Sequence, residues 1–277
     1  MSGKALWSIL QKTTSSLLNN LDVDLRTHDY GITVLHVSEE TPVVKSTVNV
    51  SSVRPYIVCC IVRSIDLLSQ KVFKNFISLQ TKLHDSICEK RNIATIATHD
   101  LSKIKGNLLY NALDPETVMI QPLMRNKAVS LGTLYQQLRE EAEALRKEKK
   151  RNVFSGIHKY LYLLDHKTVF PFLSDAAETV ISFPPITNSD VSKISPTTTD
   201  LFLEVTSNDS YIKCKTVMDQ LLLEIVKSDL ATVDETNENF KHITVEQVKI
   251  VDEEFNLKLV YPSRTDLNFD NVDVSYE

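Results

Sequence analysis

One short segment in the first quarter of the chain constrains the fold more than any other. Residues 56–62 read Tyr-Ile-Val-Cys-Cys-Ile-Val, a continuous apolar run without a charged side chain. A run of this kind is typical of a strand that is covered on both faces. The sequence therefore predicts a central strand with a layer of structure against each face.

The segments around this run alternate between strand and helix patterns. Residues 30–53 are rich in β-branched side chains and predict one or two strands. Residues 68–91 place apolar side chains at steps of three and four, which predicts a helix. Residues 93–98 predict a short strand. We expect His99 and Asp100 in the turn after it, in a turn or capping role rather than as an acid/base pair.

The second half of the chain continues the mixture. Residues 180–183 predict a strand that Pro184 and Pro185 end, because proline lacks a backbone N–H. Residues 201–206 alternate apolar and polar side chains, which predicts another strand, and residues 208–228 predict a helix with Asn208 or Asp209 as its N-cap. Because strands and helices mix without regular βαβ alternation, the predicted fold class is α+β.

Composition narrows the classes of function. The chain has 31 Lys+Arg against 36 Asp+Glu, a formal net charge of −5, so bulk positive charge does not hold a polyanion and any nucleic-acid contact needs a local patch. Only 5 of 277 residues are glycine, which argues against a glycine-rich phosphate loop. The composition is that of a globular protein.

The cysteine spacing indicates no metal site, and the apolar runs indicate no membrane-spanning segment. We expect no cofactor. The four cysteines have no Cys-x-x-Cys pair and no spacing that suits zinc, so we expect buried free thiols in a reducing compartment. No segment approaches about 18 consecutive apolar residues, and the N-terminus has no signal-peptide core. We therefore expect a cytoplasmic protein with no membrane partner.

A basic run ends the most polar predicted helix, over residues 130–151. The candidate RNA-binding residues in it are Lys147, Lys149, Lys150 and Arg151. Two interpretations stay open. The run contacts phosphate groups, or it is a solvated helix end whose cations complement the helix dipole.

The segment from Ser182 to Glu204 is a candidate ligand site. It runs from a strand through Pro184-Pro185 into a loop dense in hydroxyls and amides, and then into another strand. Such a loop recognises a small polar ligand or simply covers a sheet edge. Glu204 faces away from the Leu201–Leu203 side of its strand, and if that face is enclosed, its carboxylate needs a partner or a ligand.

Five motifs occur in the order in which a known family has them. They are Arg54–Val62, Leu79–His84 with Ile87–Arg91, Ala97–Leu101, Pro184–Asn188, and Asp190 with Ser192–Ile194. Together they resemble the B3/B4 domain of the archaeal/eukaryotic phenylalanyl-tRNA synthetase β subunit. The resemblance implies a B3/B4-type fold, with mixed sheets and flanking helices. A second set of segments resembles more closely the C-terminal region of the leucine-rich-repeat-containing protein 47 family: Val153–Tyr160, Ile181–Ser189 and Thr197–Thr206.

The resemblance divides the chain into one main domain and two extensions. Residues 1–51 are expected to form an N-terminal helix and strand extension. Residues 52–262 form the B3/B4-like domain, in which the helix 130–151 is an insertion and the polar segment 229–242 is a flexible loop. Residues 263–277 are expected to be a loose C-terminal tail.

The resemblance also implies a pocket. In the synthetase, this domain binds the aminoacylated 3′ end of tRNA and hydrolyses tyrosine misattached to the phenylalanine tRNA. The family's pocket glutamate falls on Glu204, a pocket threonine on Thr198 and the preceding loop on Asn188. Two departures occur in that loop, where Ser189 replaces a glycine and Val191 replaces a histidine. Because they add a side chain and remove a polar group, we expect ligand binding to tolerate them better than editing.

The leading hypothesis is an RNA-binding, translation-associated module that contacts tRNA or another RNA, and not DNA. The class II aminoacylation motifs are missing from this sequence, so we expect no aminoacylation activity. One alternative is an enzyme, a free-standing editing hydrolase of mischarged phenylalanine tRNA. The other is a protein-interaction scaffold in the translation machinery, which the net charge of −5 mildly favours.

Overall fold

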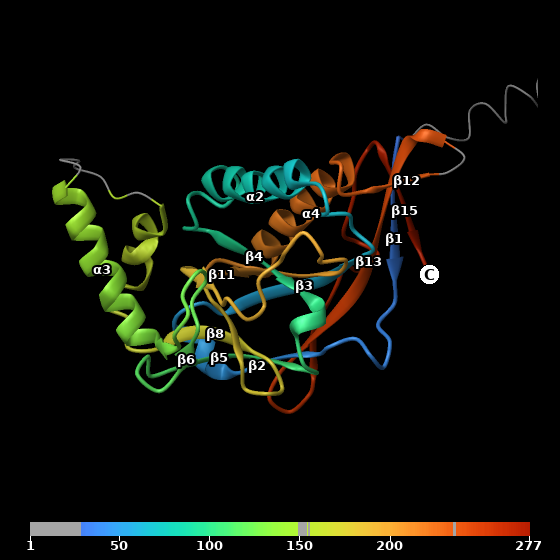
Figure 1. Ribbon diagram of the computed structural model, residues 1–277. Helices are drawn as coiled ribbons and strands as arrows, with labels where there is room; N and C mark the ends of the chain where they lie inside the picture. The colour runs from blue at the N-terminus through green and yellow to red at the C-terminus, as the bar shows by residue number, and fades with distance from the viewer. Residues whose placement is uncertain (1–28, 149–153, 155, 235–236) are drawn as a thin grey trace, which may run out of the picture.

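The computed structural model describes residues 29–148, 154, 156–234 and 237–277 (Figure 1). The helix predicted in the N-terminal extension falls on residues 1–28, which lie outside the described residues. The helices are α2 (Gln70–Asp85), α3 (Leu131–Glu148) and α4 (Tyr211–Lys227), with the 3₁₀ helices η1 (Val48–Ser52), η2 (Leu101–Lys103) and η3 (Gly156–Leu164). The strands are β1 (Tyr30–Leu35), β2 (Val44–Ser46), β3 (Tyr56–Arg63), β4 (Ala94–Asp100), β5 (Leu108–Leu113), β6 (Met119–Ile120), β7 (Val129–Ser130), β8 (Phe170–Ser174), β9 (Val180–Phe183), β10 (Thr187–Asn188), β11 (Leu201–Ser207), β12 (Thr232–Asp234), β13 (Asn237–Val251), β14 (Leu257–Tyr261) and β15 (Val272–Tyr276).

The apolar run becomes the central strand β3, as predicted. It pairs antiparallel with β11 on one side and with β13 on the other. Val58 and Cys60 pack into a core shared with helix α4, whereas Ile57 and Cys59 pack into a second core shared with β5 and β9. Figure 1 shows α2 and α4 over one face of these strands, with β5 and β8 beyond the other. The predicted α+β class with mixed sheets and flanking helices is confirmed.

A third core covers the outer face of the second sheet. Leu134 and Leu138 of α3 pack with Leu161 of η3 against Phe172 and Phe183. The thin apolar stripe of the predicted polar helix is therefore the side that α3 buries, and its charged side faces outward. The strand order runs β10-β9-β8-β5-β2-β13-β3-β11-β4, so β13 belongs to both layers and β4 is an edge strand.

The turn predicted at His99 and Asp100 is wrong, whereas the capping role is confirmed for Asp100, the N-cap of η2. Both are the last residues of β4, which pairs with β11 through its whole length, and both side chains are buried. The chain turns one residue later, in η2, where the Asp100 side chain accepts the N–H of Ser102. Strand pairing extends β4 because the ladder continues from Leu101 N–H to the carbonyl of Asp200.

Two segments expected to be irregular contain strands. The segment 229–242 includes β12 and the start of β13, and the expected loose tail includes β15. β12 pairs with β13, and β15 pairs in parallel register with β1 and also packs Val272, Val274 and Tyr276 into the core. The N-cap of α4 is Ser210, whose hydroxyl accepts the N–H of Lys213, and not Asn208 or Asp209.

Candidate functional site

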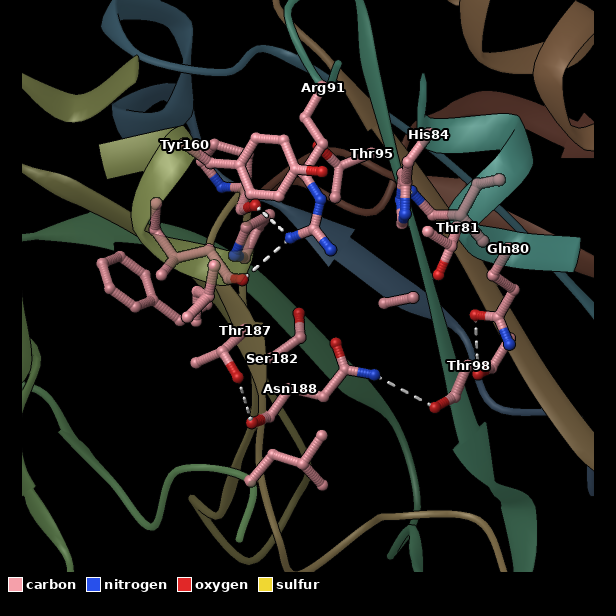
Figure 2. Close-up of a pocket in the computed structure, with 18 of the residues that line it drawn as sticks. Gln80, Thr81, His84, Arg91, Thr95, Thr98, Tyr160, Ser182, Thr187 and Asn188 are labelled. Atoms are coloured by element: carbon pink, nitrogen blue, oxygen red, sulfur yellow. Dashed lines mark hydrogen bonds between the residues drawn. The ribbon is translucent and has the colours of Figure 1, made fainter. Parts of the chain in front are cut away.

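A pocket of about 550 Å³ opens at the free edge of β4. Helix α2 forms one wall, β9 and the turn at Pro184-Pro185 form the opposite wall, and η3 reaches the rim. Figure 2 shows side chains from these elements converging on one space. The volume lies within the range of small-ligand sites in proteins. The pocket therefore forms because β4 is the last strand of the sheet, while α2 on one side and β9 with the Pro184-Pro185 turn on the other extend beyond it.

The carboxylate of Glu204 lies at the buried end of this pocket. Glu204 is only 1% exposed, in the middle of β11 on the face that the second sheet covers. The Ser182 hydroxyl donates to its Oε1 at 2.7 Å, whereas Oε2 receives no hydrogen bond from a described residue. The nearest polar group to Oε2 is His99 Nε2, at 3.4 Å, so this oxygen keeps the capacity to accept a ligand hydroxyl.

His99 is the nearest titratable neighbour of this carboxylate. Its Nε2 lies 3.4 Å from Oε2 of Glu204, and its Nδ1 lies 2.8 Å from the hydroxyl of Ser192. When Ser192 donates to Nδ1, the ring carries its proton on Nε2, facing the carboxylate. His99 therefore lies between the Ser192 hydroxyl and the Glu204 carboxylate.

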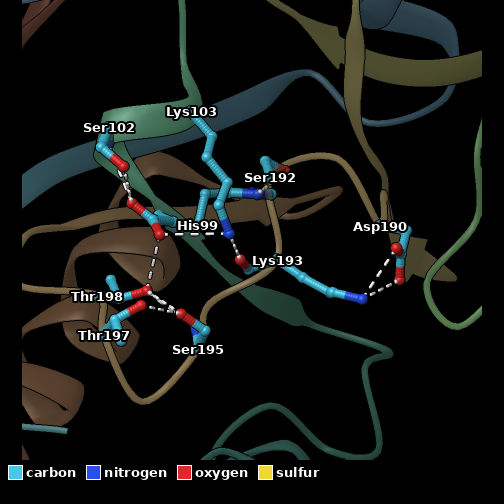
Figure 3. A network of polar contacts seen from close by, with 10 residues as sticks. His99, Ser102, Lys103, Asp190, Ser192, Lys193, Ser195, Thr197 and Thr198 are labelled. Atoms are coloured by element: carbon cyan, nitrogen blue, oxygen red, sulfur yellow. Dashed lines mark hydrogen bonds and ion pairs between the residues drawn. The ribbon is translucent and has the colours of Figure 1, made fainter. Parts of the chain in front are cut away.

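Of the three residues predicted for the pocket, the structure brings two together. Asn188 lines the pocket beside Glu204 and donates from Nδ2 to the carbonyl of Thr98 at 3.2 Å. Thr198 is buried elsewhere, where its hydroxyl donates to Asp100 at 2.8 Å and accepts the N–H of Ser195 at 2.9 Å. Figure 3 shows Thr198 within this neighbouring polar network. Thr198 therefore shapes the loop and does not line the pocket wall.

The two departures from the family loop also lie off the pocket wall. Ser189 is buried, and its hydroxyl donates to the carbonyl of Gln121 at 2.9 Å. Val191 is 41% exposed. Neither residue belongs to the pocket lining, so the shape of the pocket does not depend directly on these two side chains.

Arg91 is a pocket residue that pattern analysis did not single out. Its Nη1 donates to the carbonyls of Pro185 and Ile186 at 2.7 and 2.8 Å, and its guanidinium stacks on Tyr160 with 4.3 Å between the guanidinium carbon and the ring centre. Burial lowers the pKa of this group. Figure 2 shows the guanidinium reaching into the pocket. Arg91 thus ties the Pro184-Pro185 turn to the segment before β4.

His84 and Gln80 are two further residues that only the structure reveals. The Nε2 of His84 accepts the N–H of Ile96 at 2.9 Å, and burial lowers the pKa of its ring to about 3, so the ring is neutral near pH 7. The Oε1 of Gln80 accepts from the Thr98 hydroxyl at 3.2 Å, while its buried Nε2 has no partner among the described residues. In the sequence both residues belong to a family motif, and the motif alone does not show that their side chains reach the pocket.

The described wall of the pocket carries more positive than negative charge. Arg91, Lys159 and Lys193 line it, against the single carboxylate of Glu204. Lys159 and Lys193 each pair with an aspartate that is not part of the lining, at 2.8 and 2.9 Å. Lys147 lies exposed on α3 and is not part of this wall, and Lys149, Lys150 and Arg151 lie outside the described residues.

The described residues contain no candidate metal site and no reactive cysteine. They contain no group of three or more His, Cys, Asp or Glu side chains placed to hold a metal ion. The four cysteines are free and buried, and burial raises the pKa of Cys88 and Cys214 to about 12. At neutral pH these thiols are protonated and do not act as nucleophiles. Within the described part of the chain, no helix has the length and apolar character to cross a membrane.

Comparison with known proteins gives a consistent set of relatives. No family model matches the chain. The chain is 33% identical over 214 residues to the phenylalanine–tRNA ligase β subunit of Dictyostelium discoideum, which covers 77% of this chain and 31% of that protein. It is 32% identical over 228 residues to the same subunit of Schizosaccharomyces pombe, covering 82% of this chain and 34% of the relative. The chain thus spans about a third of the length of these curated relatives.

A solved structure shows the same fold. It is an N-terminal fragment of the phenylalanyl-tRNA synthetase β subunit from Pyrococcus horikoshii, with a TM-score of 0.64 and 22% sequence identity, covering 84% of this chain and 58% of that one. The fold predicted from the resemblance is therefore confirmed. The chain is a homologue of the phenylalanyl-tRNA synthetase β subunit over its B3/B4-like region.

Proposed function

We propose that this chain binds the aminoacylated 3′ end of a tRNA in the pocket beside β4, as a cytoplasmic, translation-associated module that does not charge tRNA itself. One observation carries the proposal: the buried carboxylate of Glu204 lines a pocket of about 550 Å³, and its Oε2 accepts no hydrogen bond from a described residue, with His99 Nε2 3.4 Å away. A phenol hydroxyl donating to this oxygen would satisfy it. The pocket volume suits an amino acid joined to a nucleoside.

The charges on the pocket wall support a local contact with RNA. Three cations against one carboxylate line the pocket in a chain whose net charge is −5. Each phosphate that such cations neutralise releases condensed counterions, at about 0.7 per contact on a single strand. Because Arg91 is held by two backbone carbonyls and the two lysines are paired with aspartates, we expect a log–log slope shallower than about −2, unlike the steep slope of a protein that coats RNA.

Binding of charged and uncharged tRNA tests the proposal. We expect phenylalanine tRNA that carries tyrosine through a non-hydrolysable amide to bind more tightly than the phenylalanyl and uncharged forms. Glu204→Gln should remove that preference, and Glu254→Gln, at an exposed turn, should keep it. Absence of salt-sensitive binding for every form of tRNA would contradict the proposal.

The second candidate function is editing of mischarged phenylalanine tRNA. Glu204 favours it, because a site that hydrogen-bonds a substrate hydroxyl discriminates against the analogue without it far more strongly than apolar shape does. Hydrolysis would then use an oriented water with backbone donors and no nucleophilic side chain. Deacylation of tyrosylated phenylalanine tRNA should slow in Glu204→Gln, and equal rates in wild type and variant would exclude this role.

The third candidate is a scaffold for translation-machinery proteins, related to the leucine-rich-repeat-containing protein 47 family. The resemblance of Val153–Tyr160, Ile181–Ser189 and Thr197–Thr206 supports that relation. Helix α3 supports the scaffold role, because it buries one apolar stripe and turns a charged face outward. Partners that remain bound after ribonuclease treatment would favour the scaffold, and partners lost on that treatment would favour RNA binding.

A further inference from the structure

The free edge of β4 presents a defined set of backbone groups to the pocket. β4 pairs with β11 in continuous register from Ala94 to Asp100. The ladder continues through the N–H of Leu101 to Asp200, so the odd-numbered residues of β4 bond to β11 and the even-numbered ones face the free edge. Two bonds confirm this polarity, since the N–H of Ile96 goes to His84 and that of Asp100 goes to the carbonyl of Ser192.

Side chains form hydrogen bonds with two of these backbone groups, and the two backbone groups that lie between them remain unbonded among the described residues. His84 accepts the N–H of Ile96 at 2.9 Å, and Asn188 donates to the carbonyl of Thr98 at 3.2 Å. The carbonyl of Ile96 and the N–H of Thr98 have no hydrogen-bond partner among the described residues, and both residues line the pocket. One acceptor, the carbonyl of Ile96, and one donor, the N–H of Thr98, are thus available. They lie immediately before and after Ala97.

This pair matches one strand residue in one orientation. In a parallel bridge, a residue donates its N–H to the carbonyl before its partner and accepts from the N–H after it. An antiparallel hydrogen-bonded pair would instead need both groups of one residue, and at Ile96 and Thr98 one of each is already occupied. The edge therefore accepts a single amino-acid unit opposite Ala97, running parallel to β4.

We propose that the α-amino-acid moiety of the ligand docks on this edge, in an inference that rests on the function proposed above. Its α-amino group donates to the carbonyl of Ile96, and its carbonyl oxygen accepts from the N–H of Thr98. That N–H also points at the oxygen on which negative charge develops when an ester is attacked, which is the position of an oxyanion donor.

The register fixes the direction of the ligand side chain. A residue that pairs with Ala97 in a parallel bridge places its side chain on the same face as Ala97, which is also the face of Glu204 because Ala97 and Glu204 are direct partners. Two strand spacings, about 10 Å, separate the ligand backbone from that of Glu204. The small Ala97 side chain lies between them, so an L-tyrosyl side chain leans over it towards Oε2, whereas a D-residue points towards α2.

Three small probes and two variants test this docking mode by calorimetric titration. The probes are 3′-deoxy-3′-(L-tyrosylamino)adenosine, its D-epimer and its desamino analogue. The variants are Thr98→Pro, which removes the N–H at a position where an edge strand tolerates proline, and Glu204→Gln, which removes the carboxylate. Thermal unfolding of both variants checks the fold.

We expect Thr98→Pro and the desamino analogue each to weaken binding by about tenfold. Glu204→Gln should weaken the L-probe and leave the D-epimer unchanged. Equal affinity for the L-probe, its epimer and its desamino analogue would overturn the edge docking while leaving the proposed function intact, and this comparison needs no variant to fold. Wild-type protein that binds tyrosylated tRNA but none of the probes would likewise refute it. Binding of neither tRNA nor probe would refute the proposed function and this inference together.

Discussion

The buried imidazole of His84 should make this protein lose stability in mild acid. Its Nε2 accepts the N–H of Ile96, its side chain is buried, and burial, reinforced by the nearby Arg91, lowers the pKa from 6.5 to about 3. In the unfolded chain the ring titrates near its ordinary value. As the pH falls below 6.5, the unfolded state therefore binds a proton that the folded state does not, and the folded state is progressively disfavoured.

Linkage sets the size of this effect. One pKa unit corresponds to about 1.4 kcal/mol, so the difference between 6.5 and about 3 amounts to about 5 kcal/mol, all of it lost below pH 3. Between pH 7 and pH 5 the same relation gives a loss of about 2 kcal/mol. For a domain of this size, that loss lowers Tm by about 4–8 °C.

Urea unfolding at pH 7 and pH 5 measures the effect when wild type is compared with His84→Gln. Glutamine offers an acceptor to the N–H of Ile96 and does not titrate, so the variant should lose about 2 kcal/mol less than wild type. His166→Asn, at an exposed position with positive φ, should behave like wild type. The same pH dependence in wild type and His84→Gln would refute the reasoning.

Substitutions at three other positions test contacts around the pocket and core. Arg91→Met should lower Tm because it frees the carbonyls that the guanidinium binds, and Arg91→Lys should not restore it, since one ammonium cannot bind both carbonyls and stack on a ring; unchanged melting curves would contradict this. Ser189→Gly should leave the affinity for the L-tyrosyl probe unchanged in calorimetric titration and lower the free energy of unfolding by about 1 kcal/mol, whereas altered affinity would place Ser189 in the site. Tyr261→Phe removes the donor to Asp219 and should cost about 1–3 kcal/mol in urea unfolding, against no change if that carboxylate is satisfied elsewhere.

The parts of the fold that the sequence predicts are those whose own side chains are buried. β3 and β11 carry apolar or alternating patterns, and α2 and α4 have apolar faces, so each pattern reports its own burial. β12 is held by backbone pairing with β13, and backbone pairing leaves little trace in side-chain polarity. β15 does alternate, since Val272, Val274 and Tyr276 pack into the core, but this short pattern was not recognised as a strand.

The same distinction divides the candidate site. Glu204 was predictable, because a carboxylate in a strand next to a polar loop has to find a partner if its face is covered. The role of Thr198 depends on a local turn that directs its hydroxyl to Asp100, which spacing alone does not reveal. Arg91 and His84 act through Pro185 and Ile96, and only the folded chain shows which of their atoms meet.

The pairing of β1 with β13 and β15 has a consequence for synthesis. Tyr30 lies opposite Lys241 and Val272, so a strand made early has both neighbours supplied more than 200 residues later. On the ribosome, residues 30–35 have no native sheet partner until more than 200 further residues have been synthesised. Contacts this distant in sequence close slowly, because loop entropy is lost before pairing compensates for it. The early strand is therefore the segment most in need of protection by a chaperone while translation continues.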